Sequence, residues 1–129
     1  MLTRRTLLVA IGATVLAPSS LLAAQRIKYD AAAFQAAQDA GKSILVHITA
    51  PWCGECKLQK PIVQSLSELP DFEELLIIEI DFDSQKDAVK AVKARKQSTL
   101  ITFKGKQETG RAVGITKQAK IEAIMRKAL

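Results

Sequence analysis

The two cysteines of the chain, Cys53 and Cys56, are three positions apart within the segment Trp52–Lys57. A strand-like run, Ser43–Thr49, precedes them, and a helical pattern follows as far as about Leu69. Cys53 therefore stands at a helix start, where unpaired backbone N–H groups and the positive end of the helix dipole stabilise a thiolate. Cys56, one turn later, can close a short disulfide. A Cys-x-x-Cys between a strand and a helix predicts a thiol–disulfide redox site.

Two other uses of this cysteine pair are a structural disulfide and half of a zinc site. Structural zinc usually takes four ligands, whereas the chain has two cysteines and one histidine. A disulfide that closes so small a loop removes little chain entropy. We therefore favour redox chemistry, with Cys53 as an exposed attacking nucleophile and Cys56 as the resolving thiol that breaks the mixed disulfide.

The segment Ala50–Lys57 resembles the active-site segment of thioredoxins and differs from it at Glu55, where thioredoxins carry proline. Pro61 stands where that family kinks its active-site helix. Weaker similarity continues in Ser98–Gly105 and Arg111–Gly114. The resemblance covers about residues 27–129 and implies a thioredoxin fold with disulfide oxidoreductase activity.

The expected elements agree with that fold. They are a strand at Ile27–Tyr29, a helix from Ala31 to near Gly41 capped by Asp30, strands at Ser43–Thr49 and Leu75–Phe82, helices at Cys53–Leu69 and Gln85–Arg95, a hairpin of Leu100–Phe103 and Thr109–Val113, and a last helix capped by Thr116. In the last helix we expect Ile121, Ile124 and Leu129 to face inward. The order β-α-β-α-β-α-β-β-α is the thioredoxin topology, an α/β fold with a mixed central sheet between helix layers.

His47 is one departure from the thioredoxin pattern. Thioredoxins have at this position a buried aspartate that accepts a proton from the second cysteine. An imidazole can titrate near neutral pH, so His47 could act as the proton acceptor for Cys56. Two other roles stay open: a packed core histidine with a satisfied hydrogen bond, and a metal ligand beside Cys53 and Cys56.

Ser98 is a second departure. Thioredoxins place a cis-proline directly before the Thr-Leu pair, facing the cysteines, and here Ser98 precedes Thr99. Because proline is the residue that makes a cis bond cheap, we expect a trans bond and altered substrate docking. Proline also blocks metal approach in many thioredoxin-like sites, so its absence favours a metal site. We assign substrate binding to Trp52, Ser98 and Thr99.

Gly54 and Glu55 lie between the cysteines, and we expect them to tune the redox properties of the pair. A carboxylate beside a thiolate disfavours the charged sulfur. A less stabilised thiolate makes the reduced form less favourable, so the pair should be relatively reducing. The alternative is that Glu55 points into solvent and changes little.

Residues 1–24 have the plan of a secretory signal: basic Arg4 and Arg5, an apolar run Leu7–Leu16 and a small-residue end at Ala24. We expect cleavage after Ala24, a thioredoxin-like domain over residues 25–129, and a periplasmic location. Thr3–Leu8 also resembles a twin-arginine export signal, so the export route stays open. An uncleaved membrane anchor is an alternative, although the run is short for a spanning helix.

The chain has 19 Lys and Arg against 13 Asp and Glu, with the two signs interspersed. This is the pattern of solvated faces, and no basic stripe with interleaved aromatic residues indicates nucleic-acid binding. We expect a monomer without a cofactor. An exported reductant also needs a membrane electron donor, because a secreted pool of reductant is not available.

The leading prediction is thus an exported thiol–disulfide oxidoreductase that reduces disulfides in periplasmic proteins. It is similar to the periplasmic thioredoxin-like reductants, some of which serve cytochrome c maturation. The alternative is a metal-handling module in which Cys53, Cys56 and His47 bind copper(I) or zinc. A third hypothesis, a non-catalytic interaction domain, would be favoured by an unreactive Cys53.

Overall fold

The structure is a computed structural model that describes residues 23–129. The predicted signal peptide, apart from its last two positions, and the twin-arginine segment lie outside these residues. No helix within the described part has the length and apolar character needed to cross a membrane.

The predicted order of strands and helices is confirmed. The elements are β1 (Gln25–Lys28), α1 (Ala31–Asp39), β2 (Ser43–Thr49), α2 (Gly54–Ser67), β3 (Leu76–Asp81), α3 (Lys86–Ala91), β4 (Thr99–Lys104), β5 (Gln107–Val113) and α4 (Gln118–Arg126), with an additional short 3-10 helix, η1 (Pro70–Phe72). Asp30 caps α1 as expected, because its carboxylate accepts the N–H of Ala33 at 2.8 Å.

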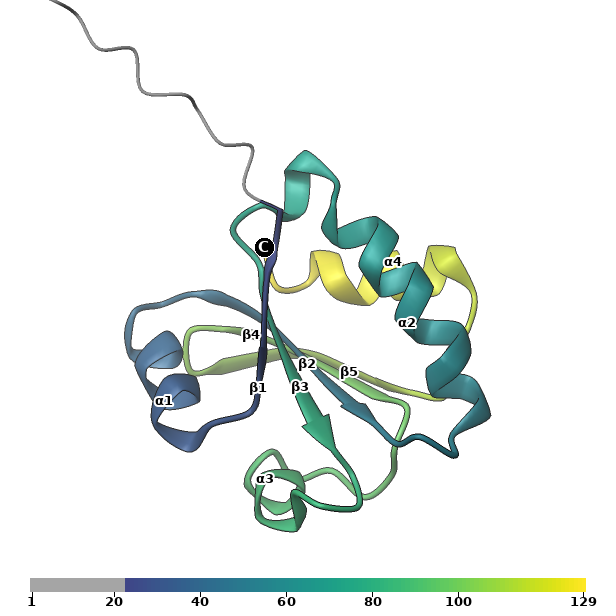
Figure 1. The fold of residues 1–129 in the computed structure, drawn as a ribbon. Coiled ribbons are helices and arrows are strands. Elements are labelled where there is room, and N and C mark those ends of the chain that lie inside the picture. Colours follow the sequence, from purple (N-terminus) through teal and green to yellow (C-terminus); the bar gives the residue numbers. More distant parts are fainter. Residues whose placement is uncertain (1–22) are drawn as a thin grey trace, which may run out of the picture.

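The five strands form one mixed sheet in the order β1-β3-β2-β4-β5. β1, β3 and β2 run parallel, and β4 and β5 are antiparallel to their neighbours. Figure 1 shows α2 and α4 together on one side of the sheet, with α1 and α3 on the other. This arrangement confirms the predicted thioredoxin fold.

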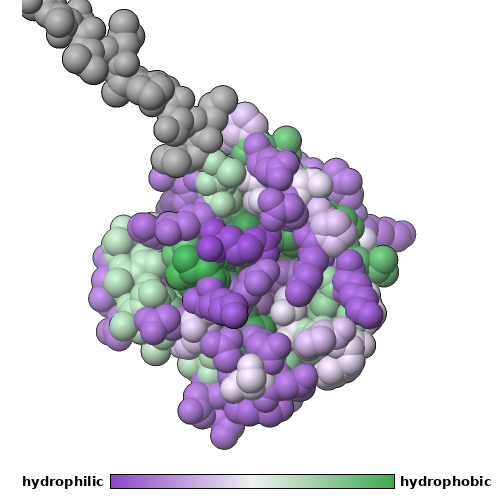
Figure 2. Space-filling model, in the orientation of Figure 1, coloured by the Kyte–Doolittle hydropathy of each residue, from purple (hydrophilic) through white to green (hydrophobic). Residues whose placement is uncertain are grey.

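The central strand β2 is buried along its whole length, because helices cover both faces of the sheet. Its alternate residues Ile44, Val46 and Ile48 belong to the core beneath α1 and α3. Leu45 belongs to the second core, with residues of α2 and α4. Since side chains alternate along a strand, His47 lies on the same face as Leu45, under α2. In Figure 2 the exposed alanines of α1 form a mildly apolar patch on a largely hydrophilic surface.

Three local expectations were wrong. The N-cap of α4 is Lys117 without a side-chain hydrogen bond, so Thr116 does not cap this helix. Leu129 lies beyond α4 and is 48% exposed, whereas Met125 and Ala128 are buried. The helix α3 ends earlier than predicted, because Lys93 adopts a left-handed backbone conformation with φ of 57° that an α-helix cannot contain.

Four chain segments meet at one end of the sheet, where parallel β2 and β3 both finish. The register pairs Thr49 with Asp81 on β3 and Ile48 with Thr99 on β4. Thr99 is in turn paired with Val113, the last residue of β5. The segments that follow β2 and β3, the start of β4 and the end of β5 therefore converge on the cysteines.

Candidate active site

The cysteines occupy the start of α2, as the sequence predicted. Cys53 is the N-cap of this helix, and its sulfur accepts the backbone N–H of Cys56 at 3.1 Å. The two residues form a disulfide with their Cα atoms 5.3 Å apart. On reduction, the same N–H is positioned to stabilise a thiolate on Cys53.

The expected exposure of Cys53 was wrong for this oxidised form. Cys53 is 3% exposed and Cys56 1% exposed, and both pack with Ala50 and the partly buried Phe82. The Cys53 side chain turns inward over the first turn of α2 because it caps that turn and is bonded to Cys56. A substrate disulfide must therefore approach a recessed sulfur.

Trp52 forms part of the rim around that recess. Its side chain is among the most exposed large apolar groups, at 59%. The indole N–H donates to the Asp83 carboxylate at 2.7 Å, and the ring packs edge-to-face on Phe82. Trp52 is thus held in the rim as a contact surface. We did not identify Asp83 from the sequence, although its place just after a predicted strand was an available signal.

His47 is fully buried and is hydrogen-bonded to one residue, Gln59. The imidazole Nε2 lies 3.0 Å from Gln59 Oε1. The amide nitrogen of Gln59 donates to the carbonyl oxygens of Ser98, at 3.1 Å, and Ile115, at 2.9 Å. Because both amide protons go to carbonyls, Oε1 must accept, and His47 Nε2 must carry the proton and donate. His47 Nδ1 is then a buried lone pair without a partner.

Burial lowers the pKa of His47 from 6.5 to about 4, because the surrounding apolar core disfavours a charged imidazole. The hydrogen bond to Gln59 and the carboxylate of Glu79 oppose this shift only partly. Glu79 is the register partner of His47 on β3 and forms an ion pair with Arg26. At neutral pH, His47 is therefore an uncharged group beneath the active-site helix.

The proposed metal-ligand role of His47 finds no support in this geometry. Within residues 23–129, no group of three or more His, Cys, Asp or Glu side chains is arranged to hold a metal ion. Cys53, Cys56 and His47 are therefore not brought together as a ligand set. The imidazole Nε2 of His47 is hydrogen-bonded to Gln59.

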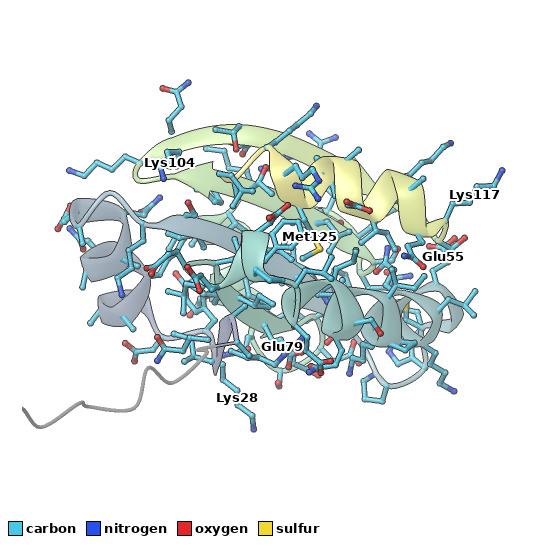
Figure 3. The ribbon with its side chains drawn as sticks, turned by 90° about the horizontal axis from the view of Figure 1, so that it is seen from above. Lys28, Glu55, Glu79, Lys104, Lys117 and Met125 are labelled. Atoms are coloured by element: carbon cyan, nitrogen blue, oxygen red, sulfur yellow. A yellow bond between two sulfur atoms is a disulfide. The ribbon has the colours of Figure 1, made fainter. Side chains whose placement is uncertain are left out.

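Ser98 links the start of β4 to the first turn of α2. Its hydroxyl donates to Glu55 Oε2 at 2.7 Å, so Glu55 is not simply a solvent-facing carboxylate. A Cβ atom at Gly114 would lie 3.0 Å from the same oxygen, so glycine leaves room for the carboxylate. In Figure 3, Glu55 lies at the end of the molecule where α2 and α4 both begin, as does Lys117. Gly54 beside it is exposed.

Ser98 and Thr99 differ in what they offer a substrate. All peptide bonds among the described residues are trans, including the bond between these two. Ser98 has a left-handed φ of 56°, and its carbonyl also accepts the N–H of Gly114 at 3.0 Å. The Thr99 hydroxyl donates to the Lys96 carbonyl at 2.7 Å, and the residue is 1% exposed. Its side chain is therefore engaged inside the protein.

Gln59, like Asp83, was not predicted as a site residue from the sequence. It is fully buried, at one of the inward positions of α2 that also include Cys56, Val63 and Leu66. A polar residue on the apolar stripe of an amphipathic helix was the available signal, because buried amides are retained where they satisfy several partners.

The thioredoxin family model matches residues 25–127. Human thioredoxin is 37% identical over 93 residues, which are 70% of this chain and 86% of that protein. An H-type thioredoxin of Fagopyrum esculentum is 33% identical over 91 residues, 70% of this chain and 77% of that protein. The crystal structure of Trxlp from Edwardsiella tarda superposes with a TM-score of 0.76 at 33% identity, and the match covers 78% of this chain and 98% of that one.

This chain belongs to the thioredoxin family. Its redox centre is the Cys53–Cys56 pair at the start of α2. Family membership and this cysteine arrangement together make the protein a thiol–disulfide oxidoreductase. As in other thioredoxins, its substrates are proteins that contain disulfides.

We predict that Gln59→Leu destabilises the oxidised protein by about 1–3 kcal/mol. The substitution leaves the buried His47 N–H without a partner, removes the side-chain donor of the Ile115 carbonyl, and takes one of two donors from the Ser98 carbonyl, and an unsatisfied buried group costs about 1–3 kcal/mol. Urea denaturation gives the free energy of unfolding. Gln64→Leu is the matched control on the exposed face of α2 and should change stability by less than about 0.5 kcal/mol. Equal effects of the two substitutions would contradict the assigned network.

The neutral His47 predicts a pH dependence of stability. Between pH 6.5 and about 4 the unfolded chain binds a proton at this residue and the folded protein does not. The contribution of His47 to the free energy of unfolding is therefore complete above pH 6.5. It falls by about 3 kcal/mol as the pH drops through that window.

His47→Gln removes this titration and leaves the carboxylates of the protein unchanged. We expect its free energy of unfolding, measured by urea denaturation at several pH values, to fall less than that of the wild type between pH 6.5 and 4. Parallel pH profiles for the two proteins would show that His47 titrates normally in the fold.

Proposed function

We propose that this protein is an exported thiol–disulfide oxidoreductase that reduces disulfides in periplasmic proteins. The observation that carries the direction of electron flow is the neutral His47, held by Gln59 beneath the active-site helix. Glu55 adds a carboxylate to the first turn of α2. With no cationic side chain between the cysteines, the helix N-terminus is the principal stabilisation of the thiolate, which favours a reducing pair.

In the proposed reaction, the Cys53 thiolate attacks one sulfur of a substrate disulfide, and the other substrate sulfur leaves as a thiolate that takes a proton from solvent. Cys56 then loses its proton and attacks the Cys53 sulfur of the mixed disulfide. This step forms the Cys53–Cys56 disulfide, and the second substrate sulfur leaves as a thiolate that takes up a proton, so the substrate is released as a dithiol. Two electrons pass from the protein to the substrate, and a membrane electron donor restores the dithiol. We propose that the protein acts as a monomer.

His47 is the proposed proton acceptor for Cys56. Its Nε2 is committed to Gln59, so the acceptor would be Nδ1, whose lone pair is buried and has no partner. A pKa of about 4 keeps this nitrogen unprotonated at neutral pH and so available. The same low pKa makes it a weak base, so the transfer is expected to assist the release step rather than to ionise Cys56 beforehand.

We predict that three variants separate formation of the mixed disulfide from its release. Cys53→Ser should abolish reduction of insulin, because the attacking sulfur is lost. Cys56→Ser should accumulate a mixed disulfide that is visible on non-reducing gels, because the resolving sulfur is lost. His47→Gln should slow release on the order of a hundredfold, at the low end of what general-base catalysis contributes, and leave formation unchanged.

Stopped-flow kinetics with reduced protein measures the two steps separately. Turnover by Cys53→Ser would overturn the assignment of the attacking residue. Equal slowing of both steps in His47→Gln would make His47 a packing residue. Gln64→Leu is a suitable control, since this exposed residue lies on the same helix as the site and has no role in the proposed steps.

A further inference from the structure

An open groove of about 710 Å³ lies between β5 and the segment that joins α3 to β4. Ala94 and Val113 contribute apolar side chains to its lining, which also includes the buried Thr99. Lys93, Lys96 and Arg95 also line it. Its volume is within the range of binding sites for ligands of drug size. The active-site mechanism described above uses none of the cationic residues of this groove.

The groove has an excess of positive charge. Lys93, Arg95 and Lys96 are exposed, and none of them forms an ion pair with another described residue. The only acidic lining residue is Glu108, which Arg111 engages through two hydrogen bonds of 3.2 and 2.7 Å. The hydrogen bonds from Arg111 hold the pKa of Glu108 below its ordinary value. Lys93 is close enough to Glu108 to contribute to this lowering of the Glu108 pKa, while Arg95 and Lys96 face solvent without an acidic partner among the lining residues.

The backbone that presents these cations is fixed. Arg111 donates to the carbonyl oxygens of Val92, at 2.7 Å, and Lys93, at 3.1 Å, and so ties β5 to the start of the segment. The Thr99 hydroxyl donates to the Lys96 carbonyl at 2.7 Å and fixes its other end. The groove is thus formed without a ligand, which reduces the entropy lost on binding.

One end of the groove lies directly beside the redox site. Thr99 follows Ser98, whose hydroxyl is bonded to Glu55 in the first turn of α2. Val113 pairs with Thr99 across the sheet and precedes Gly114, whose N–H donates to Ser98. A chain segment whose disulfide reaches Cys53 can therefore continue past Val113 into the groove.

We propose that this cationic groove binds an acidic, extended segment that flanks the target disulfide of the substrate protein. The proposal rests on the proposed reductase function and adds the charge of the substrate to it. Carboxylates complement the three exposed cations, and the apolar lining accommodates the stems of the side chains. β5 is an edge strand of the sheet, so no strand of the described fold pairs with its outer side.

The test compares two fluorescent disulfide-free peptides, one rich in Asp and Glu and one with Asn and Gln at the same positions. Fluorescence anisotropy with the oxidised protein should show at least about tenfold tighter binding of the acidic peptide, the low end of what electrostatic focusing provides. This preference should disappear in the triple variant Lys93→Gln, Arg95→Gln, Lys96→Gln. It should persist in Lys28→Gln, Lys42→Gln, Lys127→Gln, which loses the same charge at other exposed sites.

Equal binding of the two peptides by the wild type would overturn the proposal, as would equal loss of the preference in both triple variants. The proposal would also be overturned if the wild type bound anionic phospholipid vesicles and not the acidic peptide, and if only the groove variant lost this binding. That result would indicate that the groove binds a membrane surface. Since these readouts need no redox turnover, they are independent of the reductase function. Failure of the wild type to reduce insulin would contradict the reductase function and leave the peptide result intact.

Discussion

The side-chain amide of Gln59 is the constraint on which the active site depends. It accepts from His47 on the central strand and donates to the carbonyls of Ser98 and Ile115, on the two segments that flank the cysteines. One residue of the active-site helix therefore fixes the helix, the sheet and both neighbouring segments relative to one another. Because the bonds to His47 and Ser98 are buried and the bond to Ile115 is part-buried, the network is costly to leave half-formed, and this cost holds the site in one geometry.

The same network determines the charge of the site. Gln59 accepts a hydrogen bond from the Nε2–H group of His47, and burial disfavours the addition of a second proton at Nδ1. His47 is therefore neutral at physiological pH. Glu55 is held by Ser98 near the start of α2. The backbone N–H groups at the start of the helix are thus the principal stabilisation of a Cys53 thiolate. A pair with little stabilisation of its reduced form gives up electrons readily, which is why we propose a reductase.

Much of this arrangement was predictable from sequence, for reasons that are local. The strand Ser43–Thr49, the helix-start placement of Cys53 and the cap at Asp30 follow from short-range patterns, and all three were found. The role of Gln59 was not predictable, because its partners Ser98 and Ile115 are remote in sequence and lie close only in the folded sheet. The bond between Glu55 and Ser98 was missed for the same reason, whereas the burial of Cys53 follows from contacts close in sequence, its cap of α2 and its bond to Cys56. The end of α3 depended on the backbone conformation of Lys93, which its residue type does not favour.

The measurement that most directly tests the central claim, that this is a reducing pair, is the reduction potential of Cys53–Cys56 from a glutathione redox titration. An uncharged His47 and a carboxylate at position 55 predict a value near that of thioredoxin, about −270 mV. A value above about −170 mV would place the pair among oxidases and isomerases, and would contradict the account given for the charge of the site.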